Sequence, residues 1–407
     1  MSPLATAQDP PSPRLARIGH WLFAGHLITV FSIAASNILL GLTLASAPWT
    51  LRGRRIPWAE LAPLTVPLGL YSLWLAGSIL ASFDPLTSLS RMREVTTMSA
   101  LLLAPLLVRG ERQVRRLVDC LIGVGALLAG AGLAQYLVGY GGIDRRIRGP
   151  FSHYMTFSGF LLICDLLLIA SLILGRHRGR QAWRWAALAL INVALLGSLT
   201  RSAWVGLGLT LTLYLLVRSP RWLLAYVPAA LVFAVVAPPA VLERVASITD
   251  LRDRSNYDRI CMLKAGMEMV ADRPLFGLGP EMVERRYAIY RPPSAPRYEV
   301  PHLHNSFLQL AAERGLPALA AWLALLAAGA LKSWRLYTRE GGDGGPRADL
   351  YVGMLLALLA FSLAGLFENN WGDTEVQRTA LFLIALPFCL AAGRGEEEGT
   401  ERMGGMG

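Results

Sequence analysis

The chain has 407 residues, of which 54% are hydrophobic and 16% are charged, and its formal net charge is +11. A soluble protein is usually about a quarter charged, because its water-facing surface needs charge. The composition therefore argues against an ordinary water-soluble enzyme and excludes collagen, coiled-coil, disordered and small disulfide-scaffold classes. It indicates a polytopic helical membrane protein.

Apolar blocks long enough to cross a bilayer recur along the chain, and they predict an all-α fold of about 12 transmembrane helices. The first two blocks are nearly continuous, so they form either a broken hairpin or one long helix. No small-residue cleavage site follows the first block, and we expect it to be retained as a span. The predicted spans are residues 18–34, 36–49, 61–82, 94–108, 114–138, 155–174, 182–199, 202–217, 222–238, 316–334, 349–367 and 377–392.

The basic residues predict the orientation of these spans, because short cytoplasmic loops are enriched in Lys and Arg. With the N-terminus inside, the cytoplasmic segments hold 21 of the 39 basic residues and the short outer segments hold 7. The predicted organisation is a cytoplasmic tail at 1–17, a membrane bundle at 18–238, a long outer loop with short helices at 239–315, a second bundle at 316–392 and a cytoplasmic tail at 393–407.

The positive charge does not require a nucleic-acid partner. The chain has no helix-turn-helix, RNA-binding or zinc-finger signature. Much of the excess charge lies at the cytoplasmic ends of spans, where arginine meets anionic headgroups. The four cysteines show neither disulfide nor zinc-site spacing.

Four places on the outer side carry candidate functional residues, and the first is the turn at 197–204. Thr200 or Ser202 can cap the following helix, whose first amide groups then carry a partial positive charge. Arg201 beside that helix start suits a phosphate. The alternative is an interfacial arginine that reaches lipid headgroups.

The second place lies in the long loop, where Ile260, Leu263, Met267 and Val270 repeat at helical spacing. Arg259 falls on the edge of this apolar face, so it lies either against the protein and membrane or in solvent. The stretch at 273–280 is rich in Gly and Pro but lacks the Lys and Ser/Thr of a phosphate-binding loop, and we interpret it as structural.

The third place is the segment at 302–308. On a helix, His304, Leu308 and Ala311 would share one face, which puts the imidazole on the apolar side at the outer membrane edge. A single histidine there is usually structural. Histidine is, however, the side chain best suited to remove a proton near neutral pH.

The fourth place is the turn at 145–153, where Arg145, Arg146, Arg148 and His153 either anchor headgroups or bind substrate. Two acids elsewhere complete the set. Glu368 ends an outer span and is a candidate partner for an arginine. Asp165 lies within a span, where an acid paired with a hydroxyl or amide is favoured over a proton relay.

Together these features resemble the O-antigen ligase and polymerase superfamily, polytopic membrane glycosyltransferases of the bacterial cell envelope. The matching parts are the turn at 199–204, the stretch from Arg259 through 273–280, and His304-Asn305 followed by Gly315. The last is the most specific, because His-Asn, an apolar helix, Glu and Gly-Leu recur together across the superfamily. Clear matches extend over about 145–320, and the upstream spans agree in layout.

The resemblance implies a GT-C-like enzyme of the bacterial inner membrane, with the active site facing the periplasm. Such ligases transfer a glycan from undecaprenyl diphosphate to the lipid A core. Arg201 and Arg259 would then clamp the diphosphate, and His304 would take the proton of the acceptor hydroxyl, with inversion at the sugar. Further candidates for binding the diphosphate or glycan are Arg148, His153, Asn305 and Glu368. No Asp-x-Asp motif occurs, so neither a metal nor another cofactor is expected.

Three functions fit this sequence. The first is the O-antigen ligase with the lipid A core as acceptor. The second is a repeat-unit polymerase or a protein O-glycosylating ligase, which would share the Arg and His positions. The third is a transporter of lipid-linked glycan, although the chain lacks the internal repeat that many transporter families show.

Overall fold

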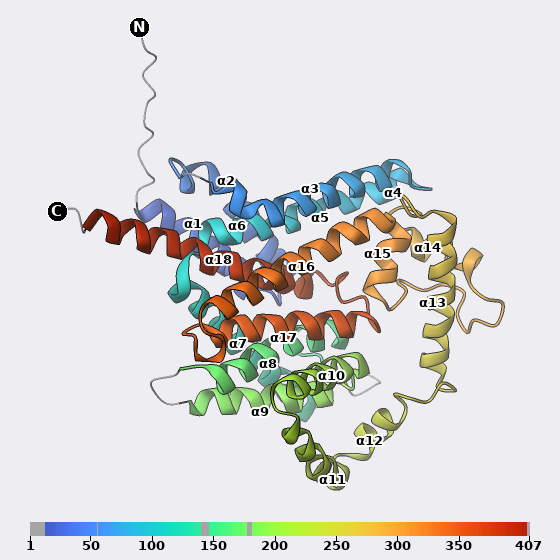
Figure 1. The fold of residues 1–407 in the computed structure, drawn as a ribbon. Coiled ribbons are helices and arrows are strands. Elements are labelled where there is room, and N and C mark those ends of the chain that lie inside the picture. The colour runs from blue at the N-terminus through green and yellow to red at the C-terminus, as the bar shows by residue number, and fades with distance from the viewer. Residues whose placement is uncertain (1–12, 55, 140–145, 177–180, 405–407) are drawn as a thin grey trace.

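The structure, a computed structural model, describes residues 13–54, 56–139, 146–176 and 181–404. Within these ranges all regular structure is helical, as predicted, and the long helices lie side by side in one bundle (Figure 1). Arg145 and parts of the predicted tails (1–12 and 405–407) lie outside the described residues.

The helices follow one another in four groups. The first group is α1 (Pro13–Ile28), α2 (Ile33–Thr50), α3 (Trp58–Leu80), α4 (Pro85–Leu89), η1 (Ser90–Met92), α5 (Arg93–Met98), α6 (Ala100–Leu107) and α7 (Gly110–Leu137). The second is α8 (Tyr154–Leu174), α9 (Ala182–Gly197), α10 (Arg201–Arg218), η2 (Pro220–Ala225) and α11 (Tyr226–Val236). The third is α12 (Pro239–Ala246), α13 (Arg254–Asp272), α14 (Met282–Tyr290) and α15 (Ser306–Arg314). The fourth is α16 (Leu316–Arg339), η3 (Gly342–Gly344), α17 (Ala348–Gly365) and α18 (Thr374–Gly404).

Seven helices in the described part of the chain are long and apolar enough to cross a membrane. They are α2, α3, α7, α8, α16, α17 and the segment Thr374–Gly393 of α18. The other five predicted spans fall on helices that are shorter, broken or less apolar, namely α1, α5 with α6, α9, α10, and η2 with α11. The structure therefore supports a polytopic membrane protein, while the count of twelve remains a prediction.

The first two helices form a hairpin, which decides between the two predicted arrangements. The chain turns at residues 29–32, where Ser32 caps α2 by accepting a hydrogen bond from Ala35 N–H. His26 then bonds Ser36 across the hairpin. The turn between the two helices thus lies at 29–32, a few residues before residue 35, where the predicted spans were divided.

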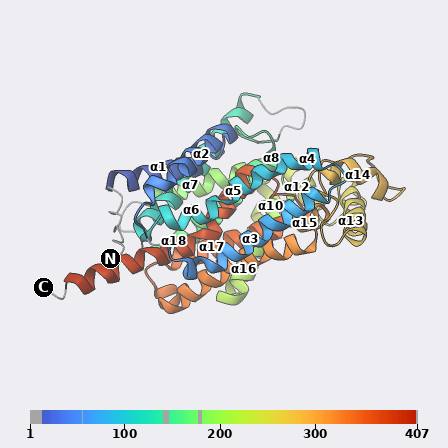
Figure 2. The same cartoon turned by 90° about the horizontal axis from the view of Figure 1, so that it is seen from above.

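The centre of the bundle is formed by α8, α17 and α18, which are the most buried of the long helices. Around them α3 packs on α16, α6 on α18 and α10 on α17, and Figure 2 shows these helices running nearly parallel. Asp165 of α8 lies in this core and accepts a hydrogen bond from the Asn192 amide at 2.8 Å. Asp165 is thus paired with an amide, as predicted, while its structural role remains a prediction. All four cysteines are free.

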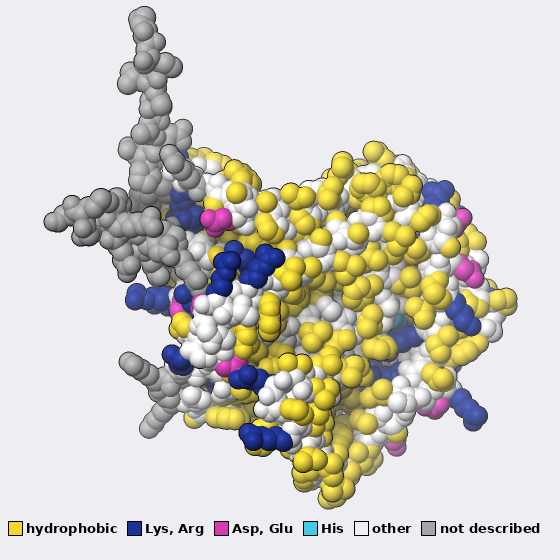
Figure 3. All heavy atoms as spheres, in the orientation of Figure 1, with side chains coloured by type: hydrophobic (Ala, Val, Ile, Leu, Met, Phe, Trp, Pro, Cys, Tyr) yellow, Lys and Arg dark blue, Asp and Glu magenta, His cyan; other side chains and the backbone are white. Residues whose placement is uncertain are grey.

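Hydrophobic side chains cover the middle of the face shown in Figure 3, and basic side chains gather toward its two ends. The described ends of α1 and α18 lie at one end of the bundle (Figure 1). Exposed tryptophans lie at helix ends on this side, where indole rings suit a membrane–water interface: Trp49, Trp58, Trp183, Trp222 and Trp334.

Several arginines at this end pair with acids, whereas the sequence had suggested lipid headgroups as their main partners. Arg115 bonds Asp349 at 2.6 Å, and Arg184 bonds Asp119 at 2.9 Å. These pairs connect α7 with α17 and with α9. Part of the positive charge therefore holds helices together.

Helices α13, α14 and α15 lie at the opposite end of the bundle (Figure 1). Backbone hydrogen bonds from Leu278 N–H to Ala312 O and from Gly279 N–H to Glu313 O hold the 273–280 loop against α15. Gly277 and Gly315 have φ of +66° and +84°, and a Cβ at Gly315 would lie 2.0 Å from Leu275 O. The Gly-rich loop is therefore structural, as predicted, because only glycine permits this close backbone approach.

A candidate active site at the end of the bundle

The central feature of the site is a hydrogen bond between His304 and Glu368. His304 Nδ1 lies 2.9 Å and 3.1 Å from the two carboxylate oxygens. The two residues are far apart in sequence, and the loop before α15 meets the loop between α17 and α18 here. His304 precedes α15 instead of lying on its apolar face, and its φ is +50°.

Asn305 explains why His304 stands outside the helix. Its side-chain oxygen caps α15 by accepting a hydrogen bond from Leu308 N–H, so the helix begins only after it. Its amide donates to Leu366 O at 3.1 Å. Asn305 thus ties the histidine loop to the loop that carries Glu368.

The Glu368 carboxylate is buried but charged. Burial raises its pKa, but the hydrogen bond from His304 and the nearby His302 and Arg259 lower it to about 2. Because an ionised carboxylate only accepts hydrogen bonds, His304 Nδ1 must carry the proton. The other ring nitrogen, Nε2, is then free to accept a proton, as in other carboxylate–histidine pairs.

A cavity of about 520 Å³, which we call the cationic cavity, lies beside this pair. It is lined by four arginines, three histidines and three acids: Arg146, Arg244, Arg259, Arg297, His153, His302, His304, Asp258, Glu368 and Asp373. Among the described residues, Arg297 lies 2.8 Å from Asp258 and Arg259 lies 3.7 Å from Glu368.

The cationic cavity is electrostatically suited to an anion. Burial lowers the pKa of Arg259, and the neighbouring Arg201 lowers it further against the opposing effect of Glu368. Burial and repulsion from Arg201 and Arg146 likewise lower the pKa of Arg244. A bound anion would relieve this repulsion, and guanidinium groups bind phosphate oxygens in pairs.

A second cavity, of about 330 Å³, adjoins the first and is lined mainly by apolar side chains. We call it the apolar cavity. Its walls include Val205, Ile248, Leu251, Ile260, Leu263, Leu303, Leu366 and Phe367. Arg259 and His304 line both cavities, so they stand where an apolar chain would meet an anionic group.

Arg201 has a different environment from the one expected. It occupies the first position of α10, but the Thr200 side chain bonds Ser198 and does not cap the helix. Arg201 is only 5% exposed, and its guanidinium donates to Ser247, Asp253 and Ser255. Arg201 thus clamps the 247–255 loop to α10 and contributes one edge of the apolar cavity.

This clamp leads to a test of Arg201. We expect Arg201→Ala to lower the activity of the protein at least about tenfold without preventing membrane insertion, because it removes every bond of the clamp, and Asp253→Asn to lower it less, because an Asn oxygen and the two serines still accept from Arg201. Activity assays on inserted protein measure this. Near-normal activity of Arg201→Ala would remove this residue from the mechanism.

Of the two remaining candidate residues from the sequence, His153 and Arg148, one lines the cationic cavity and the other does not. His153 lines the cationic cavity, and its Nδ1 accepts a hydrogen bond from Met155 N–H at the start of α8. Arg148 donates to Ser152 O and is not among the residues that line the two cavities. Arg146 takes its place in the cationic cavity, where it stacks over the Tyr154 ring.

Several site residues were not singled out from the sequence: Arg244, Arg297, His302, Asp258 and Asp373. Arg244 lies on an amphipathic helix and Arg297 in a loop, and no local pattern marks either. His302 could have been noticed in the sequence, because it lies two residues before His304. In the structure the two ring centroids are 4.3 Å apart.

His302, His304 and Glu368 could offer ligand atoms to a metal ion, since these atoms lie within 4.8 Å of one another. A metal would have to replace the hydrogen bond between His304 Nδ1 and Glu368. Four arginines beside this cluster would also repel a divalent cation. The surroundings therefore favour an anion.

The helical bundle and this site define a polytopic membrane protein. At one end of the bundle it has a pocket lined by arginines and histidines. A family model described as O-antigen ligase matches residues 185–323. The matched segment contains Arg201, Arg259 and His304, and the match supports membership of the chain in the O-antigen ligase superfamily. No curated protein matches the chain significantly.

Proposed function

We propose that the protein is an O-antigen ligase that transfers a glycan from undecaprenyl diphosphate to the lipid A core. The observation that carries this proposal is the meeting of the cationic and apolar cavities at Arg259 and His304. A polyprenyl diphosphate has the same division, with an apolar chain on one side of a phosphate group that carries negative charge. The superfamily match supports a membrane glycosyltransferase.

In this proposal the lipid chain enters the apolar cavity, and the diphosphate lies against Arg259, Arg244 and Arg146. The acceptor hydroxyl attacks the anomeric carbon opposite the leaving group, which inverts the sugar. As the bond from that carbon to the phosphate oxygen breaks, its electron pair stays on the diphosphate, where the arginines stabilise the charge.

His304 Nε2 takes the proton of the acceptor hydroxyl as the new glycosidic bond forms. The resulting imidazolium is stabilised by the Glu368 carboxylate, 2.9 Å from Nδ1. Glu368 therefore acts mainly by orienting His304. This role adds to the one predicted from the sequence, since Glu368 also lies 3.7 Å from Arg259 and is thus a partner for an arginine.

The proposal also includes the topology expected from the charges. The two chain ends would lie in the cytoplasm, and the segment 239–315 would lie on the periplasmic side of the inner membrane. The exposed tryptophans and the paired arginines at the end opposite the site support a membrane surface there.

Asp373 predicts a pH dependence of donor binding. Burial and the neighbouring charge of Glu368 raise the pKa of Asp373 to about 7. Its carboxyl group is therefore neutral below about pH 7 and charged above it, where it would repel the diphosphate. We expect the donor KM to increase as the pH rises through 7, and Asp373→Asn to remove most of this increase. An equal increase in the variant would contradict the assignment.

Treatment with a chelator tests whether arginines, and not a metal ion, stabilise the leaving diphosphate. We expect glycan transfer to continue at an unchanged rate after dialysis against a chelator, because guanidinium groups stabilise the leaving group. A loss of activity that magnesium or zinc restores would contradict this expectation.

The function itself is tested with purified protein and a lipid-linked donor. Lipid A core, a second lipid-linked donor and a pilin-like protein are offered in turn as acceptors. We expect transfer to the lipid A core. Transfer to the second donor would identify a polymerase, transfer to the protein would identify a protein O-glycosylating ligase, and movement of the donor across vesicles without transfer would identify a transporter.

A further inference from the structure

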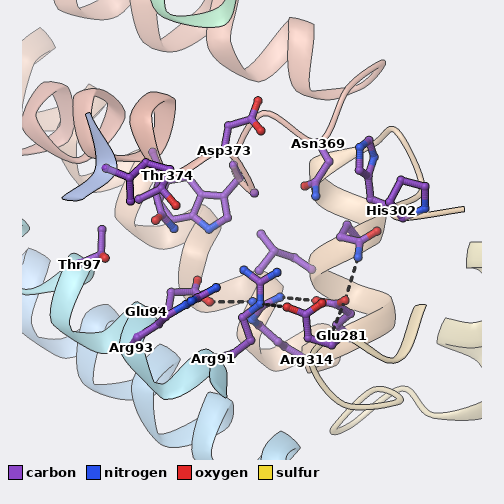
Figure 4. A pocket seen from close by; sticks show the side chains of 18 of the residues that line it. Arg91, Arg93, Glu94, Thr97, Glu281, His302, Arg314, Asn369, Asp373 and Thr374 are labelled. Carbon is purple, nitrogen blue, oxygen red and sulfur yellow. Dashed lines mark hydrogen bonds and ion pairs between the residues drawn. The ribbon is translucent and has the colours of Figure 1, made fainter. Parts of the chain in front are cut away.

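A third cavity, of about 620 Å³, shares His302 with the cationic cavity. We call it the polar cavity. Pro301, His302 and Asp373 line both the polar and the cationic cavity. Figure 4 shows His302, Asn369 and Asp373 along one side of it and Arg91, Arg93 and Glu94 on the other.

The wall of the polar cavity presents uncommitted hydrogen-bonding groups. In the described part of the chain, the side chains of Thr97, Asn369, Thr374 and Gln377 form no hydrogen bond with another protein group, although all four line the cavity. Thr97 and Gln377 are only 8% and 6% exposed. Their polar atoms have no protein partner and are not enclosed by the protein, so these two side chains are suited to a ligand with many hydroxyl groups.

The floor of the polar cavity is connected to the catalytic loop. Arg314 bonds Glu94 at 2.7 Å and Glu313 at 2.9 Å. Glu313 also accepts from Gln309, whose side-chain oxygen accepts from Leu303 N–H, next to His304. A rigid set of buried hydrogen bonds thus joins the cavity to the loop that positions the histidine.

We propose that the polar cavity binds the sugar of the acceptor, with Thr97 and Gln377 as specificity-determining residues. This inference rests on the proposed function. A sugar in the cavity would place a hydroxyl at its His302 end, where the His302 ring centroid is 4.3 Å from that of His304. Donor and acceptor then approach His304 from two separate cavities.

The test compares variants of the polar cavity with a matched control. Thr97→Val and Gln377→Leu remove the polar atoms at nearly constant volume, and Thr97→Phe fills the space. Thr338→Val is the control, because Thr338 is a threonine near the far end of α16, where it bonds only the backbone. KM for the acceptor and KM for the lipid-linked donor are measured separately for each protein.

We expect Thr97→Val and Gln377→Leu each to raise the acceptor KM about fivefold, as for a lost hydrogen bond, with the donor KM unchanged. An unchanged acceptor KM in both, or a raised donor KM, would overturn the inference. If the Thr97→Phe variant does not insert into the membrane, Thr97→Val and Gln377→Leu still test the inference. Wild-type protein that transfers to no acceptor would instead refute the proposed function.

Discussion

Replacing His304 with alanine should lower the rate of glycan transfer by roughly 10²–10⁴-fold, which is the usual contribution of a general base. Binding of the lipid-linked donor should change little, because the arginines hold the diphosphate. Single-turnover transfer and donor binding, measured on the same preparation, separate the two effects.

Two further variants sharpen this prediction. Glu368→Gln keeps the shape of the side chain but loses the charge that stabilises the imidazolium, so transfer should fall while the fold is retained. His20→Gln is the control, because His20 bonds Leu107 O far from the site. An unchanged transfer rate in His304→Ala would rule out the base role of this residue.

Replacing Arg259 with alanine should raise the donor KM about tenfold or more, since hydrogen bonds to charged groups contribute about 1.5–3 kcal/mol. The transfer rate should fall as well, because Arg259 also stabilises the departing diphosphate. Arg259→Lys keeps the charge but loses the paired N–H groups, so we expect it to recover only part of the loss.

Arg254→Ala is a suitable control for Arg259, since it removes an exposed arginine at the start of the same helix. Donor KM and kcat are measured at fixed salt, because screening weakens ionic contacts. If Arg259→Ala bound the donor as the wild type does, the diphosphate would have to lie elsewhere.

The sequence predicted the helices better than their packing. Apolar blocks identify helices because a segment that crosses the membrane must form its backbone hydrogen bonds within itself, as a helix does. They do not show how a helix ends. Thr200 bonds Ser198 instead of capping α10, and Asn305 caps α15, so the helix begins at Ser306 and excludes His304.

The site was predictable in part for a similar reason. His304 and Arg259 stand in local patterns that could be read directly. The bond between His304 and Glu368 joins residues 64 positions apart, so no spacing rule reveals it. Arg201 was visible as a basic residue at a helix start, but its partner Asp253 depends on how the 247–255 loop folds back.

A structure of the protein with a lipid-linked donor would test the central claim most directly. We predict density for the diphosphate within hydrogen-bonding distance of Arg259 and the anomeric carbon of the sugar facing His304 Nε2, with the lipid in the apolar cavity. A donor bound away from Arg259 and His304, or at the end of the bundle where α1 begins, would contradict the account.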